Sequence, residues 1–181
     1  MAERGAAIVD ADAISREILE PGGAAYQSVV DRFGPGIVGG DGRINRPALA
    51  AAVFGDTDAL ADLNRITHPV IGDIMQERML EVAAPGRIVV FDVALLEIIR
   101  DRFEFGAIVV VDAPPDRAVA RLVEQRGFTE ADARARIAAQ ISREERRRLA
   151  DAVLDNSGDR AALDAEIERV WAWLEERAAR S

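Results

Sequence analysis

The stretch Ala6-Ala7-Ile8-Val9-Asp10-Ala11-Asp12, close to the start of the chain, indicates the fold class most directly. It is a short apolar run that ends in two carboxylates, two residues apart. A continuous apolar run of this length is typical of a parallel strand that is covered on both faces. Ligands of open α/β sheets bind beyond the carboxyl ends of the strands, so the run predicts acidic side chains at the functional edge of such a sheet.

Three later runs have the same form, because each is short, apolar and ends in aspartate; they are residues 88–92, 107–112 and 152–155. An aspartate at this place also caps the helix that follows a strand, and for Asp112 and Asp155 this alternative stays open. Together the four runs predict an α/β fold with a parallel sheet flanked by helices.

Helix signals occupy most of the remaining chain. After the third run they are a proline pair, two capping-box patterns and an amphipathic repeat, at residues 114–115, 129–132, 142–145 and 160–179. Between the first two runs, residues 13–87 contain no clear strand, and clusters of glycine divide them into pieces of helical length. This segment is too long for a simple crossover. It therefore predicts an inserted helical subdomain that receives a substrate, at about residues 20–85.

Composition narrows the class of protein. The 181 residues are enough for one domain with its own core, and 49% hydrophobic with 30% charged residues is ordinary for a soluble globular protein. A net charge of −9 argues against non-specific nucleic-acid binding. The lack of cysteine excludes disulfides and thiol nucleophiles. No signal peptide or membrane-spanning run is present, so we expect no membrane partner and a cytoplasmic location.

Asp10 and Asp12 have the spacing of a catalytic pair. Residues two apart point to one face while the chain stays extended. Beside a nucleotide phosphate, one carboxylate would accept the proton of an attacking hydroxyl. The other would hold Mg²⁺, directly or through water.

Longer motifs surround this pair, among them Glu20-Pro21-Gly22, Leu63-Asn64-x-Ile66-x-His68-Pro69 and Asp155-Asn156-Ser157-Gly158. In order and spacing they resemble the dephospho-CoA kinase family. The resemblance rests on residues 3–22, 41–49, 63–69, 109–115, 126–129, 136–140 and 151–158, and so spans nearly the whole chain.

The resemblance implies an activity and a fold. Kinases of this family transfer the γ-phosphoryl group of ATP to the 3′-hydroxyl of dephospho-CoA, the last step of coenzyme A synthesis. The implied partners are dephospho-CoA and ATP, with Mg²⁺. The implied fold is a three-layer P-loop kinase: a parallel sheet between helices, a helical substrate insertion and a helical lid at about residues 126–148.

The resemblance also implies roles for single residues. Asp12 matches the general base, and Asp10 would be its companion near the metal. His68 would lie in the subdomain that receives dephospho-CoA. Alternatively, His68 begins a helix and contacts the backbone before the break that Pro69 causes.

The resemblance implies that three arginines of the lid, Arg126, Arg136 and Arg147, close on the phosphates during transfer. Of these, we favour Arg136 for this role. The alternative is a solvated helix face, because arginines 143 and 146–148 alternate with Glu144 and Glu145. Asn156 would lie in the turn beside the adenine, although such a turn is also a plain connection from strand to helix.

One local departure concerns Glu97. The family has Pro-Leu-Leu, one apolar residue and then Glu after its second long strand, whereas this chain has Ala94-Leu95-Leu96-Glu97. A shift by one residue on a helix is a rotation of about 100°. The role of Glu97 therefore stays open.

The larger departure is the phosphate loop. The family begins with a strand and the loop G-x-x-x-x-G-K-[ST], whereas Met1 aligns inside the helix that follows. All 23 basic residues are arginine, so no lysine elsewhere replaces the missing one. We expect that the first strand and the P-loop are missing, that the start was placed at an internal methionine and that this chain alone is inactive. The alternatives are a non-catalytic pseudo-kinase that binds CoA-type ligands, or a related nucleoside or nucleotide kinase.

Overall fold

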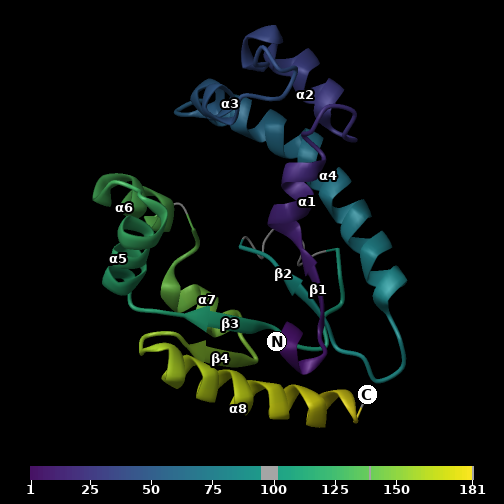
Figure 1. Cartoon of the computed structure of the whole chain (residues 1–181), viewed down its shortest axis with the longest axis vertical. Helices are drawn as coiled ribbons and strands as arrows, with labels where there is room; N and C mark the ends of the chain where they lie inside the picture. The colour runs from purple at the N-terminus through teal and green to yellow at the C-terminus, as the bar shows by residue number, and fades with distance from the viewer. Residues whose placement is uncertain (95–101, 139, 181) are drawn as a thin grey trace. The chain divides into compact units, whose positions relative to one another are not determined.

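The computed structural model describes residues 1–94, 102–138 and 140–180. Apart from the first three residues, the chain divides into two compact units, an N-terminal unit (Arg4–Phe103) and a C-terminal unit (Glu104–Ser181). Each unit has its own pair of strands and its own helices (Figure 1). We describe each unit by itself.

The N-terminal unit contains one parallel strand pair with helices inserted between its strands. Its elements are η1 (Ala2–Arg4), β1 (Ala7–Asp10), α1 (Ala11–Glu17), α2 (Tyr26–Phe33), η2 (Pro35–Ile37), α3 (Arg46–Val53), α4 (Thr57–Val82) and β2 (Val89–Asp92). β1 pairs with β2 in parallel, from Ala7 opposite Val89 to Asp10 opposite Asp92. The helices fill the segment that the glycine-divided sequence predicts to be helical.

Apolar side chains of α1, α2 and α4 form the core of this unit. Ile14, Ile18, Val29 and Met75 are at most 1% exposed. α1 packs on α4, and α4 packs on β1. Burial of each such side chain contributes about 1.5–3 kcal/mol, so the helices of the insertion hold β1 in place.

The long helix α4 continues through Pro69. The alternative that His68 begins a helix is therefore wrong, because His68 lies in the middle of α4. The helix begins earlier, where the Asp56 carboxylate accepts hydrogen bonds from the N–H groups of Asp58 and Ala59. Proline removes one backbone donor from a helix interior, but burial of residues on both sides, such as Thr67 and Ile71, keeps the helix continuous.

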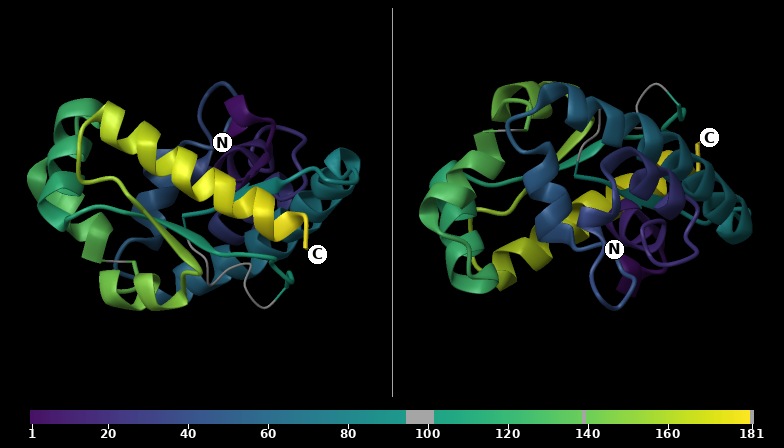
Figure 2. Two further views of the ribbon diagram at one scale, coloured as in Figure 1. Left: turned by 90° about the horizontal axis from the view of Figure 1, so that it is seen from below. Right: turned by 90° about the horizontal axis from the view of Figure 1, so that it is seen from above.

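The C-terminal unit repeats the parallel strand pair with a different set of helices. Its elements are β3 (Val109–Asp112), α5 (Pro115–Arg126), α6 (Glu130–Ala138), α7 (Arg143–Leu149), β4 (Ala152–Asp155) and α8 (Arg160–Ala178). β3 and β4 are parallel, with Asp112 opposite Asp155. α8 packs on β4, as Figure 2 shows, and Val170 of α8 is fully buried.

The N-cap hydrogen bond of each predicted capping box in this unit is confirmed. The Thr129 hydroxyl accepts a hydrogen bond from the Asp132 N–H at 3.1 Å, and α6 follows. The Ser142 hydroxyl accepts from the Glu145 N–H at 3.1 Å, and α7 follows. Each cap satisfies one backbone donor that the first turn of a helix leaves unpaired.

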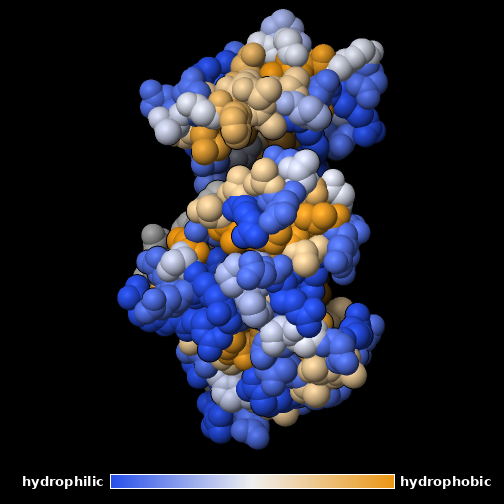
Figure 3. Space-filling view, turned by 90° about the vertical axis from the view of Figure 1, so that its left-hand side faces the viewer, coloured by the Kyte–Doolittle hydropathy of each residue, from blue (hydrophilic) through white to orange (hydrophobic). Residues whose placement is uncertain are grey.

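All four predicted strands are present and parallel, but they do not form one sheet. Within the described ranges they make two separate two-stranded sheets. Each strand therefore has one neighbour, and side chains predicted to be covered on both faces are partly exposed: Ile8 is 41% and Val111 60% exposed. On the face drawn in Figure 3, hydrophobic areas in orange lie among hydrophilic side chains in blue. No helix of the described segments has the length and apolar composition needed to cross a membrane.

Gly23 permits the close packing of the turn after α1. A Cβ atom at this position would lie 2.6 Å from the carbonyl oxygens of both Glu17 and Ile18. Both are backbone atoms at the end of a helix, so they cannot move aside as a flexible side chain can. The Gly23 N–H also donates to the Glu20 carbonyl at 2.7 Å.

We therefore expect Gly23→Ala to destabilise the protein by about 1–3 kcal/mol, the usual cost of overpacking. Thermal unfolding followed by circular dichroism measures the effect. Gly36→Ala is the matched control, because a Cβ atom at Gly36 meets nothing within 4 Å. Equal midpoints for the two variants would show that the turn adapts and that the argument is wrong.

Candidate active site

Three carboxylates gather where β1 and β2 end. Asp10 and Asp92 are register partners at the carboxyl ends of the two strands, and neighbouring strands are about 4.8 Å apart. The Asp10 carboxylate accepts a hydrogen bond from the Ala13 N–H at 2.9 Å and so caps α1. Asp12 follows in the first turn of that helix.

The two predicted catalytic aspartates do not lie on one extended segment. Because Asp10 caps α1, the helix begins directly at Ala11, and Asp12 is helical. The prediction that Asp10 and Asp12 point to one face required an extended chain, and the chain is not extended here. Asp12 is exposed, and its backbone carbonyl accepts a hydrogen bond from Arg16 Nε at 3.0 Å. In the described part of the chain, no cation forms an ion pair with the Asp12 carboxylate.

Asp92 is the member of this group that sequence reasoning did not select. Desolvation raises its pKa above the ordinary value of an aspartate, and the charges of Asp10 and Asp12 raise it further. The signal in the sequence is the shared pattern of an apolar run that ends in Asp. Among the described residues, no group of three or more side chains has the arrangement of a metal site.

His68 lies half-buried in the middle of α4, the helix that packs on α1 and β1. Its neighbour Thr67 is buried and donates its hydroxyl to the Leu63 carbonyl at 2.9 Å. His68 therefore belongs to the same unit as Asp10 and Asp12. Glu97 lies outside the described residues.

In the C-terminal unit, a buried carboxylate holds two arginines. Asp112 ends β3 and is 3% exposed. Arg143 donates to both of its oxygens, at 2.8 Å and 2.7 Å, and Arg147 donates to one of them at 2.5 Å. These hydrogen bonds, with that of Arg143 the largest, lower the pKa of Asp112 and outweigh the opposing effect of desolvation. Asp112 thus fastens α7 to the end of β3.

This arrangement corrects two alternatives from the sequence. Asp112 does not cap the helix that follows, because Pro114 precedes α5 without a side-chain cap. Nor is α7 a wholly solvated face, because Arg143 and Arg147 reach the buried Asp112. Sequence spacing could have suggested that Arg143 and Arg147 act together, since side chains four apart on a helix lie on one face. Asp155 does not cap the helix that follows either, because the N-cap of α8 is Asp159; the Asp155 carboxylate accepts from the Ser157 N–H at 2.8 Å in the turn after β4.

The other predicted lid arginines lie on α5 and α6. Arg126 is the last residue of α5 and is exposed. Arg136 is exposed on α6, and its guanidinium lies 4.5 Å from the centre of the Phe128 ring. Such a cation–π contact contributes about 0.5–1 kcal/mol at an exposed site. It orients Arg136 while leaving its N–H groups accessible.

The turn after β4 is held by α5. The Asn156 N–H donates to the Asp112 carbonyl at 2.7 Å. Arg117 donates to the Ser157 carbonyl at 3.1 Å, and Arg121 donates to the Gly158 carbonyl at 3.3 Å. Asn156 is therefore tied through its backbone to the strand end that carries Asp112. The same unit has a hollow of about 360 Å³ between α5, α6 and α7, partly lined by Arg143 and Arg146.

Parallel strand pairs that end in carboxylates and are flanked by helices place this chain in the class of α/β proteins whose ligands bind at the carboxyl ends of the strands. The comparisons with known proteins agree. Residues 1–162 match the dephospho-CoA kinase family. The dephospho-CoA kinase of Thermobifida fusca is 44% identical over 177 residues, which is 98% of this chain and 88% of that protein. That of Streptomyces avermitilis is 44% identical over 179 residues, which is 98% of this chain and 86% of that protein. The chain belongs to the dephospho-CoA kinase family, whose members are ATP-dependent kinases.

Solved structures support the fold. The crystal structure of TT1252 from Thermus thermophilus superposes with a TM-score of 0.78 at 28% identity, covering 96% of this chain and 87% of that one. The dephospho-CoA kinase from Campylobacter jejuni superposes with a TM-score of 0.67 at 20% identity, covering 97% and 88%. The predicted α/β architecture with parallel strands and helices is therefore confirmed.

Asp92→Asn should stabilise the protein at neutral pH, by less than about 1 kcal/mol. A raised pKa in the folded state means that the stability from Asp92 is present below its unfolded pKa and is lost as the pH rises through the folded value. Urea unfolding at pH 7 and at pH 3 tests this, with a gain at pH 7 alone as the expected result. A loss at pH 7 would contradict the argument.

Asp112→Asn should have the opposite effect and cost about 1–3 kcal/mol at pH 7, because it removes a charge-assisted contact to two arginines. The lowered pKa means that this stability is present above the unfolded pKa of about 4 and is lost as the pH falls through the folded value. Urea unfolding against pH should show the variant and the wild type converging in acid. Asp164→Asn, which breaks the exposed pair with Arg160, is the control and should change stability by less than 1 kcal/mol.

Proposed function

We propose that this protein transfers the γ-phosphoryl group of ATP to the 3′-hydroxyl of dephospho-CoA. The proposal rests on the position of Asp12, whose exposed carboxylate lies in the first turn of α1 beside Asp10 and Asp92. It also rests on the membership of this chain in the dephospho-CoA kinase family. Dephospho-CoA and ATP are the two substrates of this proposal.

Asp12 would act as the general base. Its carboxylate accepts the proton of the 3′-hydroxyl as the hydroxyl oxygen bonds to the γ-phosphorus. The bond from that phosphorus to the β-phosphate oxygen breaks, and ADP leaves with the electron pair. Asp10 is less suited to this role because one of its oxygens accepts the Ala13 N–H. It supports Asp12 by fixing where α1 begins.

Mg²⁺ bound largely through water would be held at this edge of the strand pair. Mg²⁺ keeps several waters and takes only one or two protein carboxylates beside nucleotide phosphates. Asp10 would hold the ion, with Asp92 next to it across the strand pair. Desolvation raises the pKa of Asp92, and repulsion from the charges of Asp10 and Asp12 raises it further; a cation here would relieve that repulsion. When bound, Mg²⁺ supplies positive charge to the phosphates.

The family resemblance assigns phosphate contacts to cationic side chains of the C-terminal unit. Arg136 and Arg126 are exposed and carry charge suited to the transferring phosphoryl group. Arg147 contacts Asp112 in this structure, so a phosphate contact requires it to exchange that carboxylate for the nucleotide. Asn156 would lie beside the adenine, and His68 would contact dephospho-CoA.

The phosphate loop is part of the proposal as well. The 181 residues contain no lysine, so we infer that the lysine and the Gly-rich loop must come from residues not included here. Each two-stranded sheet could accept a further strand, and the 60% exposed Val111 offers apolar surface for one. Reading the in-frame DNA before Met1 tests this: codons for G-x-x-x-x-G-K-[ST] are expected, and a stop codon would contradict it.

The absence of lysine also favours one second candidate, a non-catalytic protein that binds CoA-type ligands. Calorimetry on the 181-residue chain separates the two. Binding of dephospho-CoA without binding of ATP, together with a stop codon upstream, would favour the second candidate. Turnover of dephospho-CoA by the extended chain, but not of adenosine or AMP, would establish the first.

In the chain extended by its phosphate loop, Asp12→Asn should lower kcat by about 10²–10⁴-fold, the usual contribution of a general base. ADP release coupled to NADH oxidation measures turnover, and calorimetry should show that dephospho-CoA still binds. Asp58→Asn is the matched control, because Asp58 is also an exposed aspartate in the first turn of a helix. An Asp12→Asn variant with unchanged kcat would show that another group takes the proton.

A further inference from the structure

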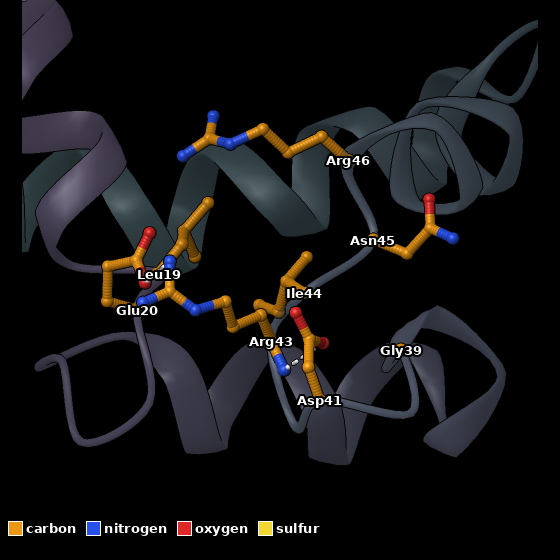
Figure 4. A pocket seen from close by; sticks show the side chains of 8 residues that line it. All are labelled: Leu19, Glu20, Gly39, Asp41, Arg43, Ile44, Asn45 and Arg46. Carbon is orange, nitrogen blue, oxygen red and sulfur yellow. Dashed lines mark hydrogen bonds and ion pairs between the residues drawn. The ribbon is translucent and has the colours of Figure 1, made fainter.

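The N-terminal unit has a pocket directly after α1 that the site described above does not use. Its volume is about 340 Å³, within the usual range for small-molecule sites. Most of its lining is polar or charged: Leu19, Glu20, Gly39, Asp41, Arg43, Ile44, Asn45 and Arg46. Figure 4 shows the Arg46 guanidinium reaching toward the Leu19–Glu20 side, with Arg43 beside Glu20.

The wall of this pocket is a fixed loop. The Gly39 N–H donates to the Arg43 carbonyl at 2.8 Å, and the Asn45 N–H donates to the Ile37 carbonyl at 2.8 Å. The Tyr26 hydroxyl donates to the Gly42 carbonyl at 2.5 Å. Asp41 accepts the Arg43 N–H at 3.0 Å, so one of its oxygens serves the loop. A loop held in this way presents Arg43 and Arg46 without a large ordering cost.

The two arginines differ in how their charge is satisfied. Arg43 pairs with Glu20 at 3.0 Å, and both side chains are about half exposed. Arg46 is exposed, and its recorded contact is a long one of 3.5 Å from Nη2 to the Arg16 carbonyl. Among the residues that the structure describes, no carboxylate pairs with Arg46 or with Arg16. Arg46 is therefore a cation of the pocket lining that lacks a counter-ion, with Arg16 next to it, and a bound anion would supply one.

The pocket also lies at a suitable distance from Asp12. Arg16 is one helical turn after Asp12 on α1, and Leu19 and Glu20 of the pocket lie in the turn that follows the end of this helix at Glu17. Asp12, Arg16 and the Arg46 guanidinium thus follow one another along α1 toward the pocket. In dephospho-CoA, the 3′-hydroxyl and the diphosphate are attached to the same ribose. A ribose placed at Asp12 can therefore direct its diphosphate along this row.

We propose that Arg46 and Arg43 bind the diphosphate of dephospho-CoA at this pocket, with Arg16 beside it and the pantetheine arm continuing past Leu19 and Ile44. The proposal rests on the proposed function, because it takes the acceptor hydroxyl to lie at Asp12. It adds that substrate recognition depends on the diphosphate. Adenosine, which has the same ribose and base but no phosphate, should bind without help from these arginines.

Calorimetry on the 181-residue chain tests the proposal. Arg46→Ala and Arg43→Ala should each weaken dephospho-CoA binding by about 10-fold or more, the usual effect of losing one charge-assisted contact. Adenosine affinity should stay the same, and inorganic pyrophosphate should compete with dephospho-CoA. Arg65→Ala is the matched control, because Arg65 is an exposed arginine of the same unit that pairs with Asp62 and does not line the pocket.

Wild-type affinity for dephospho-CoA in both variants, or no competition by pyrophosphate, would overturn the proposal and leave the proposed function intact. An equal loss of dephospho-CoA and adenosine binding would also overturn it, because the arginines would then support the unit as a whole. A chain that binds dephospho-CoA through these arginines, yet fails to phosphorylate it once the phosphate loop is present, would contradict the proposed function alone. No dephospho-CoA binding by the wild-type 181-residue chain would overturn the proposal for this pocket, whereas the proposed function is tested by turnover in the chain extended by its phosphate loop.

Discussion

The parallel pairing of β1 with β2 is the interaction on which the N-terminal unit depends. It joins strands that are separated in sequence by α1, α2, α3 and α4, and closing so long a loop costs conformational entropy. Packing of α1 on α4 and of α4 on β1 offsets that cost. The register of this pairing also sets the chemistry, because a slip of one residue would turn Asp92 to the other face and separate it from Asp10.

The strand-end aspartates show how surroundings decide what one sequence pattern does. Asp92 faces other carboxylates, and its pKa is raised; Asp112 faces two guanidinium groups, and its pKa is lowered. The Asp10 carboxylate caps α1, and the Asp155 carboxylate accepts a hydrogen bond in the turn after β4. The same position after a strand therefore carries a carboxylate with a raised pKa in one unit and an anchor for a helix in the other.

Much of this could be predicted from local sequence. Strands and caps depend on neighbouring residues, so the four apolar runs and the Ser142 cap are where the sequence predicts them. The contact of Arg143 with Asp112 joins residues 31 positions apart, and no local pattern specifies it. The pocket at Arg43 and Arg46 is likewise formed by a loop folding back on the end of α1. The division into two strand pairs depends on which strand edges pair with each other. The periodicity of apolar residues along the sequence does not specify this pairing.

Pro69 gives α4 a mechanical property that its length conceals. Pro69 has no N–H to donate to the Arg65 carbonyl four residues earlier, and the Pro69 carbonyl accepts a hydrogen bond from Arg102 at 3.4 Å. The hydrogen-bond ladder is therefore interrupted between a half that begins at Thr57 and a half that carries Ile71 and Met75. Amide hydrogen exchange should report two protected blocks in this one helix, with His68 at their junction.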